Sequence, residues 1–153
     1  MSDIFLRKAN QSDCRDIYEW RNNLSSREMS LNSEVIKFED HKLWFRHIIE
    51  SSEHFAVICS NNLKEKIGIV RFALDENAGH VSINLNPSKR GKGLSRACLA
   101  NAIDFFLLHV PKCKKLLAKV KVTNLPSKKI FESCGFTELE IIKDVITYVY
   151  ELK

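Results

Sequence analysis

Apolar residues recur along the chain with two different periods, which predicts alternating helices and strands. In the first third, the helical spacing i, i+3, i+4, i+7 occurs twice, in Ile17, Trp20, Arg21 and Leu24 and then in His41, Trp44, Phe45 and Ile48. Ser12 is expected to cap the first of these helices. Residues 25–37, between the two helices, are predicted to be a loop or a broken helix. The segments FAVICS and KIGIVRFAL, separated by NNLKE, predict a hairpin.

The second half of the chain continues with strand and helix patterns. HVSINLN alternates, with Val81, Ile83 and Leu85 on one face and Ser82, Asn84 and Asn86 on the other. A glycine-containing loop then leads into a helix whose apolar face contains Leu99, Ala102, Ile103, Phe106 and Val110. KKLLAKVKV is a predicted strand, LPSKKIFESCGF a short helix ended by Gly135, and TELEIIKD and VITYVYEL two final strands. With IFLRKA as the first strand, the order is β-α-α-β-β-β-α-β-α-β-β, a mixed α/β domain over residues 1–153.

Composition narrows the class of protein. The chain has 153 residues, 44% of them hydrophobic and 28% charged, which is typical of one globular domain and unlike disordered or collagenous chains. No apolar run approaches the roughly 20 residues of a membrane span, and MSDIFLRKAN lacks a signal-peptide core, so a cytoplasmic protein is expected. The five cysteines form no CxxC pair, so no metal site is expected. The net charge of +5 suits an anionic ligand without requiring nucleic acid.

The stretch NPSKRGKGLSRACLANAIDFF carries the first chemical signal. The N–H groups at a helix N-terminus are unpaired and attract phosphate. Gly91 and Gly93 allow close approach of the backbone, and Lys89, Arg90 and Lys92 add positive charge. The pattern is neither a Walker loop nor a complete dinucleotide fingerprint. It predicts a pyrophosphate site, with an ordinary glycine loop before a helix as the alternative.

Two motifs resemble those of the GNAT superfamily of N-acetyltransferases. PSKRGKGLSRACLANAI, preceded by HVSINLN, is similar to its acetyl-CoA motif [QR]-x-x-G-x-[GA], with Gly91 and Gly93 matching and Ser88 departing at the first position. NLPSKKIFESCGF resembles N-x-x-[AS]-x-x-[LI]-Y-x-x-x-G-F through Asn124, Ser127, Ile130, Gly135 and Phe136. The resemblance covers nearly the whole chain. It implies acetyl-CoA as cofactor and a mostly antiparallel sheet, flanked by helices, that opens between the fourth and fifth strands.

The resemblance also implies where acetyl-CoA binds. The expected contacts are Leu85, Asn86, Lys89, Arg90, Gly91, Lys92, Gly93, Leu94, Ser95, Asn124, Ser127 and Phe131. Pro87 and a bulge near it are expected to separate the two strands, so that the pantetheine arm pairs with freed backbone. A backbone N–H at Leu85 or Asn86 is expected to stabilise the oxyanion. Phe131, expected to pack near the sulfur, replaces a tyrosine that often serves as general acid. The thiol, with a pKa near roughly 8.5, then leaves unaided or with water as the acid.

The first third resembles a narrower subgroup. YEWRNN, SLNSEVIKFEDHKLWF and IGIVRF are similar to acetyltransferases of nucleotide-linked amino sugars, such as those acting on UDP-4-amino-4,6-dideoxy-N-acetyl-altrosamine in pseudaminic-acid synthesis. Ribosomal-protein N-terminal acetyltransferases share part of this pattern. The implied substrate-binding residues are Arg21, Asn22, His41, Trp44 and Arg71.

Residue chemistry leaves several roles open. An arginine on an apolar face indicates either an internal ion pair or a bound phosphate, and Arg21 and Arg71 both stand on such faces. His80 is the candidate general base because of its pKa, with Ser82, Asn84 and Glu76 as the other candidates. A sugar amine needs only modest assistance from a base.

The expected function is transfer of acetyl from acetyl-CoA to a nucleotide-linked amino sugar by direct attack in a ternary complex. The expected partner is a small molecule, not nucleic acid or a membrane, and a homodimer is common among similar proteins. The alternatives are acetylation of protein N-termini or other small amines, and an acyl-CoA sensor without turnover, which Phe131 favours.

Overall fold

The computed structural model describes residues 3–152 of the chain. Its elements are β1 (Phe5–Lys8), η1 (Gln11–Asp13), α1 (Cys14–Asn22), α2 (Leu24–Met29), α3 (Phe38–Glu50), β2 (His54–Ser60), β3 (Lys66–Asp75), β4 (Ala78–Leu85), η2 (Pro87–Lys89), α4 (Ser95–His109), β5 (Lys115–Lys121), α5 (Leu125–Ser133), β6 (Thr137–Ile142) and β7 (Val145–Glu151). The predicted order of elements is confirmed except for one additional short helix, α2. Of the two predictions for residues 25–37, a loop or a broken helix, the structure has the second: α2 is followed by residues 30–37 without α-helix. Within residues 3–152, no helix combines the length and the apolar character that crossing a bilayer requires.

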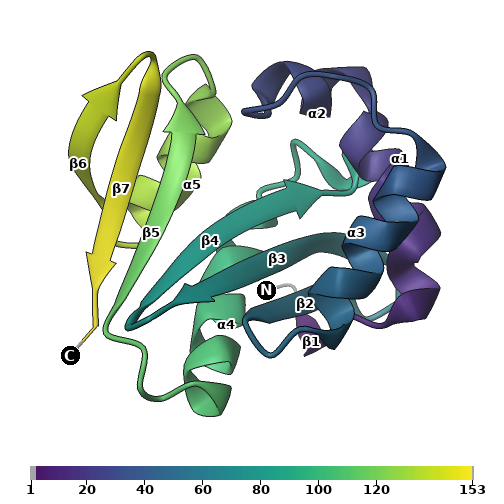
Figure 1. Ribbon diagram of the computed structural model, residues 1–153, viewed down its shortest axis with the longest axis horizontal. Helices are drawn as coiled ribbons and strands as arrows, with labels where there is room; N and C mark the ends of the chain where they lie inside the picture. The colour runs from purple at the N-terminus through teal and green to yellow at the C-terminus, as the bar shows by residue number, and fades with distance from the viewer. Residues whose placement is uncertain (1–2, 153) are drawn as a thin grey trace.

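The strands form one sheet in the order β1-β2-β3-β4-β5-β7-β6. Every neighbouring pair is antiparallel except β4 and β5, which run parallel. Helices α1 and α3 lie on one face of the sheet and α4 and α5 on the other (Figure 1). The predicted mixed α/β fold with a mostly antiparallel sheet is therefore confirmed.

Successive side chains of each strand point to opposite faces of the sheet, and each face is covered by its own apolar core. Ile58 and Ile69 of β2 and β3 pack with Ile17 of α1 and Phe45 of α3. On the other face, Phe72, Val81, Leu99 and Phe106 belong to the larger core, in which the rings of Phe72 and Phe106 stack with centroids 4.1 Å apart. The helical faces predicted from residues 41–48 and 99–106 are thus the faces that are buried.

The sheet opens between β4 and β5, as expected. Only three residue pairs join the two strands, Ala78 with Lys115, Gly79 with Leu116, and His80 with Leu117, although β4 continues to Leu85 and β5 to Lys121. Beyond these pairs the strands diverge (Figure 1). The divergence arises because β4 stays paired with β3 along its whole length, whereas β5 stays paired with β7 along its whole length.

The bulge expected near Pro87 was a wrong prediction. The β3–β4 ladder keeps one register from Gly68–Leu85 to Asp75–Ala78, and Pro87 begins the 3-10 turn η2 after the strand has ended. The opening therefore does not depend on an extra residue in β4.

Two expectations for the first helix were also wrong. Ser12 does not cap α1, which begins after Asp13 without a side-chain cap. The capping box lies at the preceding η1, where Asn10 Oδ1 accepts the Ser12 N–H at 3.0 Å and Asp13 Oδ2 accepts the Asn10 N–H at 2.9 Å. Leu24 does not continue the apolar face of α1. The helix ends at Asn22 and α2 starts in a new direction, which leaves Leu24 60% exposed.

The buried carboxylate of Asp13, in η1, joins β1 and β3. Asp13 is fully buried and accepts two hydrogen bonds of 2.8 Å from Arg7, and Lys66 Nζ lies 2.7 Å from its Oδ1. Burial alone would raise the pKa of Asp13, but these partners and the Asn10 N–H outweigh it and lower the pKa to about 2. The network ties the N-terminal strand to the middle of the sheet.

Replacing Asp13 with asparagine should lower the free energy of unfolding at pH 7 by about 2 kcal/mol, the value of its pKa shift. Because the folded-state pKa is depressed, this stabilisation is complete above the ordinary pKa of 3.8 and is lost as pH falls toward about 2. Urea unfolding of both proteins between pH 7 and pH 2 measures the difference. Asp16→Asn, a more exposed partner of Lys66, should cost under about 1 kcal/mol. Equal costs for the two variants at pH 7 would contradict this account.

Candidate active site

The backbone of β4 presents polar groups to the opening. The Asn86 N–H donates to Ile67 O at 2.8 Å, so Asn86 faces β3. Backbone groups alternate in direction along an antiparallel strand, and Leu85 and Ile83 therefore turn their N–H and C=O groups toward the β5 side. Of the two predicted oxyanion donors, Leu85 faces the opening, whereas the N–H of Asn86 is already used.

The opposite wall follows the same rule. The Leu152 N–H donates to Lys114 O at 2.8 Å, so the even-numbered residues of β5 face β7. Leu117, Lys119 and Lys121 accordingly turn their backbone groups toward β4, and pairing with β4 ends at Leu117. An extended molecule between the strands would find donors and acceptors on both sides, as an added strand would.

The loop after β4 has the conformation that its glycines predict. Gly91 and Gly93 have φ values of +74° and +70°, a left-handed region that disfavours other residues, and a Cβ on either would meet no atom within 4 Å. Helix α4 begins at Ser95 without a side-chain cap, which leaves its first N–H groups available. The loop and the helix start therefore form an open cradle suited to a phosphate group.

The side chains around this loop are less free than the sequence suggested. Lys89 Nζ lies 3.0 Å from Glu65 Oε2. Arg90 donates to Ser25 Oγ at 2.5 Å and to Ser26 Oγ, both on α2. Asn86 Oδ1 accepts hydrogen bonds from the backbone N–H and the hydroxyl of Ser88, and its Nδ2 donates to Lys66 O at 2.9 Å. Among the predicted basic residues, Lys92 alone forms no ion pair or side-chain hydrogen bond within residues 3–152.

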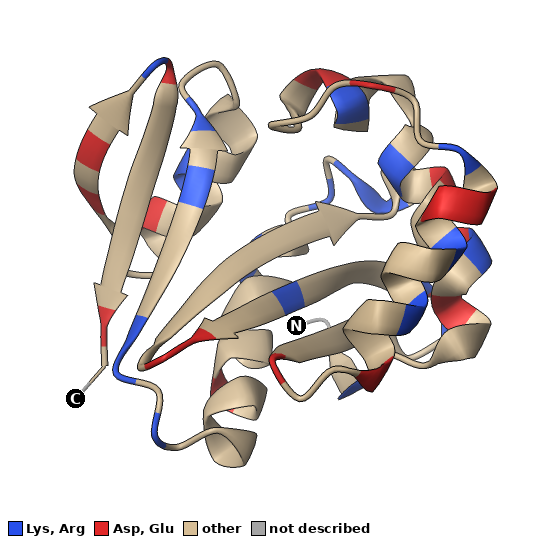
Figure 2. Cartoon of the chain, viewed as in Figure 1, with Lys and Arg blue, Asp and Glu red and all other residues tan. Residues whose placement is uncertain are grey.

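Basic residues lie on both sides of the opening. Lys119 and Lys121 belong to β5, and Lys89, Arg90 and Lys92 to the segment between β4 and α4 (Figure 2). Such a distribution of basic residues favours anions over cations, although Lys89 is already paired with Glu65.

Helix α5 places its motif residues in structural positions. Asn124 Oδ1 accepts the Ser127 N–H at 3.2 Å and caps the helix, which ends before Gly135 at φ +97°, as predicted. Phe131 is 3% exposed, and its ring lies 5.1 Å from Phe136 and 6.3 Å from Tyr148 between centroids. The Phe131 ring is therefore part of the apolar core. A phenyl ring carries no acidic proton, so Phe131 cannot act as a general acid.

Two arginines meet around one tryptophan on the α1/α3 face of the sheet. Arg71 of β3 pairs with Ser82 of β4 on this face, next to the pair formed by Ile69 and Asn84. The Cζ atom of Arg71 lies 4.8 Å from the centroid of Trp44, and Arg21 Cζ lies 3.9 Å from it. The structure thus brings together three residues that the sequence placed on separate elements, and cation–π contacts hold them.

His41 orients Arg21 and is unsuited to act as a base. Its ring is fully buried, and Nε2 lies 2.9 Å from Cys14 O, which accepts only; Nε2 therefore carries the proton. Nδ1 is then the acceptor for Arg21 Nη1 at 3.1 Å. Burial lowers the pKa of His41, the bond to Cys14 opposes this, and the charge of Arg21 lowers it further. A neutral imidazole thus fixes one guanidinium.

In the described part of the chain, neither arginine has an acidic partner. Among residues 3–152, no carboxylate lies within ion-pair distance of Arg21 or Arg71. Burial, and next the charge of Arg21, lowers the pKa of Arg71 to about 10, and burial lowers the pKa of Arg21. Of the two alternatives posed by the sequence, the internal ion pair is therefore absent. The two adjacent, partly buried cations therefore leave a positive charge on this face that no ion pair within residues 3–152 balances.

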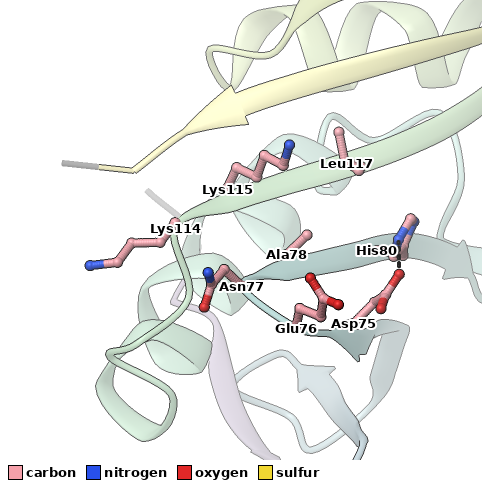
Figure 3. A pocket seen from close by; sticks show the side chains of 8 residues that line it. All are labelled: Asp75, Glu76, Asn77, Ala78, His80, Lys114, Lys115 and Leu117. Atoms are coloured by element: carbon pink, nitrogen blue, oxygen red, sulfur yellow. Dashed lines mark ion pairs between the residues drawn. The ribbon is translucent and has the colours of Figure 1, made fainter.

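Asn22 makes structural hydrogen bonds, and His80, the candidate base, lies apart from Leu85. Both polar atoms of the Asn22 amide bond the backbone of Ile36, at 2.9 Å each, and fasten residues 30–37 to α1. His80 lies 4.0 Å from Asp75 in a hollow of about 630 Å³ at the closed end of the opening (Figure 3). It precedes Leu85 by five residues, roughly 17 Å along a strand, so the structure does not bring these two predicted catalytic groups together.

Comparisons with known proteins identify the family and the fold. The family model described as an acetyltransferase (GNAT) domain matches residues 3–137. No protein with a curated description matches the chain. Spermidine N-acetyltransferase from Vibrio cholerae, solved with CoA and spermine, is similar with a TM-score of 0.85 and 20% identity over 97% of this chain and 95% of that one. A domain from Methanocaldococcus jannaschii is similar with a TM-score of 0.83 and 22% identity over 99% of this chain and 100% of the other.

Proposed function

Because the chain belongs to the GNAT family of acetyl-CoA-dependent N-acetyltransferases, we propose that its acceptor is the amine of a nucleotide-linked amino sugar. The observation that carries this proposal is the pair of arginines, Arg21 and Arg71, that share Trp44 and have no carboxylate partner in the described part of the chain. A diphosphate supplies the missing negative charge, and guanidinium groups bind it through paired hydrogen bonds.

The same arginines argue against a polyamine acceptor. Spermidine is a polycation, and two partly buried guanidinium groups would repel it where an acceptor must approach β4. The similarity to spermidine N-acetyltransferase is a similarity of fold, because the two sequences are only 20% identical. Charge on the α1/α3 face is therefore the feature that supports an anionic acceptor.

The geometry supports direct transfer between two bound substrates. The pantetheine arm would lie between β4 and β5, and the pyrophosphate against Gly91, Gly93 and the first turn of α4. The Leu85 N–H would donate to the thioester oxygen as negative charge develops on it. Positioning supplies much of the rate enhancement, because the neutral amine attacks the thioester carbon and the thiolate leaves.

Proton transfer requires little from the protein. The amine gives up one proton as the C–N bond forms and the C–S bond breaks, and the thiolate, with a conjugate acid pKa near roughly 8.5, leaves without a general acid. Ser82 and Asn84, on the face of β4 that also carries His80, lie nearer to Leu85 and would orient the amine or a water molecule. His80 would act only through intervening water.

The test of this proposal is release of CoA thiol from acetyl-CoA with separate acceptors. UDP-linked 4-amino sugars, peptide N-termini and spermidine form the panel. Turnover on a UDP-linked amino sugar above the other acceptors supports the proposal. Turnover on peptides or spermidine alone would assign the protein to that substrate class, and absence of turnover on every acceptor would favour the sensor alternative.

Replacing Arg71 or Arg21 with methionine should raise KM for the UDP-linked sugar by about 10- to 100-fold, because each change removes a charge-assisted hydrogen bond of about 1.5–3 kcal/mol. KM for acetyl-CoA should stay within about twofold. Arg46→Met is the matched control, since Arg46 is an exposed residue of the same helix as Trp44. Unchanged sugar binding in both variants would remove the basis for a diphosphate site.

A non-catalytic acyl-CoA sensor is the second candidate. The observation in its favour is Phe131, which stands where similar enzymes often have a proton-donating tyrosine and is buried in the core. Such a protein would bind acetyl-CoA without releasing thiol in the presence of any amine.

A further inference from the structure

We propose that Arg90 is a positioning residue that holds helix α2 in place for acceptor binding, and that it does not bind the cofactor phosphates. The proposal rests on the acetyl-CoA and acceptor sites proposed above. Residues of the loop between β4 and α4 then have two different roles. Lys92 and the backbone around Gly91 and Gly93 face an incoming anion, whereas Arg90 faces the protein.

Polar contacts, and not apolar packing, hold α2. None of its six residues is buried, and its apolar residues Leu24 and Met29 are 60% and 38% exposed. So short a helix without a buried face has little stability of its own. Its position must therefore come from the groups that bond it.

Those groups come from both sides of the opening. Arg90, in the loop before α4, donates through Nη1 to Ser25 Oγ at 2.5 Å and through Nη2 to Ser26 Oγ. Lys121, at the end of β5, donates to Glu28 O at 3.2 Å. Helix α2 spans the wide end of the opening between these two anchors (Figure 1). It is thus fastened to the cofactor loop on one side and to the diverging strand on the other.

The hydrogen bonds of Arg90 are better suited to hold α2 than to bind a phosphate. Both terminal nitrogens already donate to hydroxyl groups, and burial lowers the pKa of this guanidinium. Turning it toward a phosphate would break two hydrogen bonds and release α2. Lys92 is exposed and can approach an anion without breaking any such bond.

The tether reaches the acceptor site through the end of α1. Arg27 of α2 donates through Nε to Asn22 O at 3.2 Å, and Asn22 adjoins Arg21, one of the two arginines beside Trp44. Asn22 also holds residues 30–37 through Ile36. Loss of the Arg90 bonds would therefore loosen the segment that places Arg21, while the cradle at Gly91 and Gly93 keeps its shape.

The test compares Arg90→Ala, the double variant Ser25→Ala/Ser26→Ala, and the triple variant. Arg90→Ala and the double serine variant should each raise KM for the UDP-linked sugar by about 5- to 20-fold, the value of one or two hydrogen bonds. Both should leave the calorimetric Kd for acetyl-CoA within about twofold. The triple variant should be no worse than Arg90→Ala, since all three residues act through one contact.

Hydrogen exchange of residues 24–29 gives a readout that needs no acceptor. Exchange there should be faster in Arg90→Ala and in the serine double variant and unchanged in Lys92→Ala, which should instead weaken acetyl-CoA binding. The proposal is overturned if Arg90→Ala weakens acetyl-CoA binding while the serine variant changes nothing, or if exchange in α2 is unaltered. The acetyl-CoA affinity and the hydrogen exchange are measured without an acceptor. These two measurements would therefore still test the role of Arg90 if the acceptor proved not to be a nucleotide-linked sugar.

Discussion

Replacing Leu85 with proline should lower kcat by about 10²- to 10³-fold, the usual effect of removing one oxyanion donor. The Leu85 N–H faces the opening and not β3, so proline removes this donor without removing a bond of the β3–β4 ladder. Leu85 also ends its strand, and Asn84 before it is extended, as a residue preceding proline must be. Steady-state kinetics with saturating acetyl-CoA measure the loss.

Leu85→Ala is the matched control, because alanine and proline both remove the apolar side chain but alanine keeps the N–H. Its kcat should stay within about fivefold of the parent while its stability falls by about 2 kcal/mol. Circular dichroism and thermal unfolding establish that both variants are folded. Equal kcat values for the alanine and proline variants would place the oxyanion donor elsewhere.

Replacing Gly93 with valine should weaken acetyl-CoA binding by about 100-fold. Gly93 has φ +70°, and a left-handed β-branched residue costs roughly 1–2 kcal/mol, which the loop can relieve only by changing shape. That change displaces the N–H groups at the start of α4, each worth about 1.5–3 kcal/mol to a bound phosphate. Isothermal titration calorimetry with acetyl-CoA measures the effect.

Two further variants test whether the loss of affinity comes from the left-handed backbone conformation at Gly93. Asparagine tolerates the left-handed region, so Gly93→Asn should lose less affinity than Gly93→Val. Ser88→Ala, in the same loop, removes a hydroxyl whose hydrogen bond is to Asn86 Oδ1 at 3.0 Å, and affinity should stay within about twofold. A folded Gly93→Val protein with normal acetyl-CoA affinity would show that the phosphates bind away from this loop.

Features set by local chain geometry could be predicted from the sequence. The periods of residues 41–48 and 81–85 identified a helix and a strand, because the buried face of each repeats with its own geometry. Gly91, Gly93 and Gly135 adopt the positive φ values that only glycine adopts readily. The opening between β4 and β5 was predicted from the family resemblance of the two glycine-containing motifs. The bulge near Pro87, which was predicted to cause the opening, is absent from the β3–β4 ladder.

The partners of polar side chains could not be predicted. Arg90 bonds serines that precede it by 64 and 65 residues, and Lys89 pairs with Glu65, so both depend on how distant segments pack. Sequence spacing gives a basic residue a place in a motif but does not say which way its long side chain turns. The same holds for His41, whose proton position is fixed by Cys14 O and Arg21.

The opening between β4 and β5 also bears on solubility. A continuous seven-stranded sheet has two edges, here β1 and β6, but a sheet that parts in the middle has four. The two inner edges carry unpaired backbone groups that another chain's strand could join, which is the usual route to aggregation. Helix α2, anchored by Arg90 and Lys121 across the wide end, stands where such a strand would enter. We therefore expect the hydrogen bonds from Arg90 and Lys121 to α2 to limit pairing between copies of the protein as well.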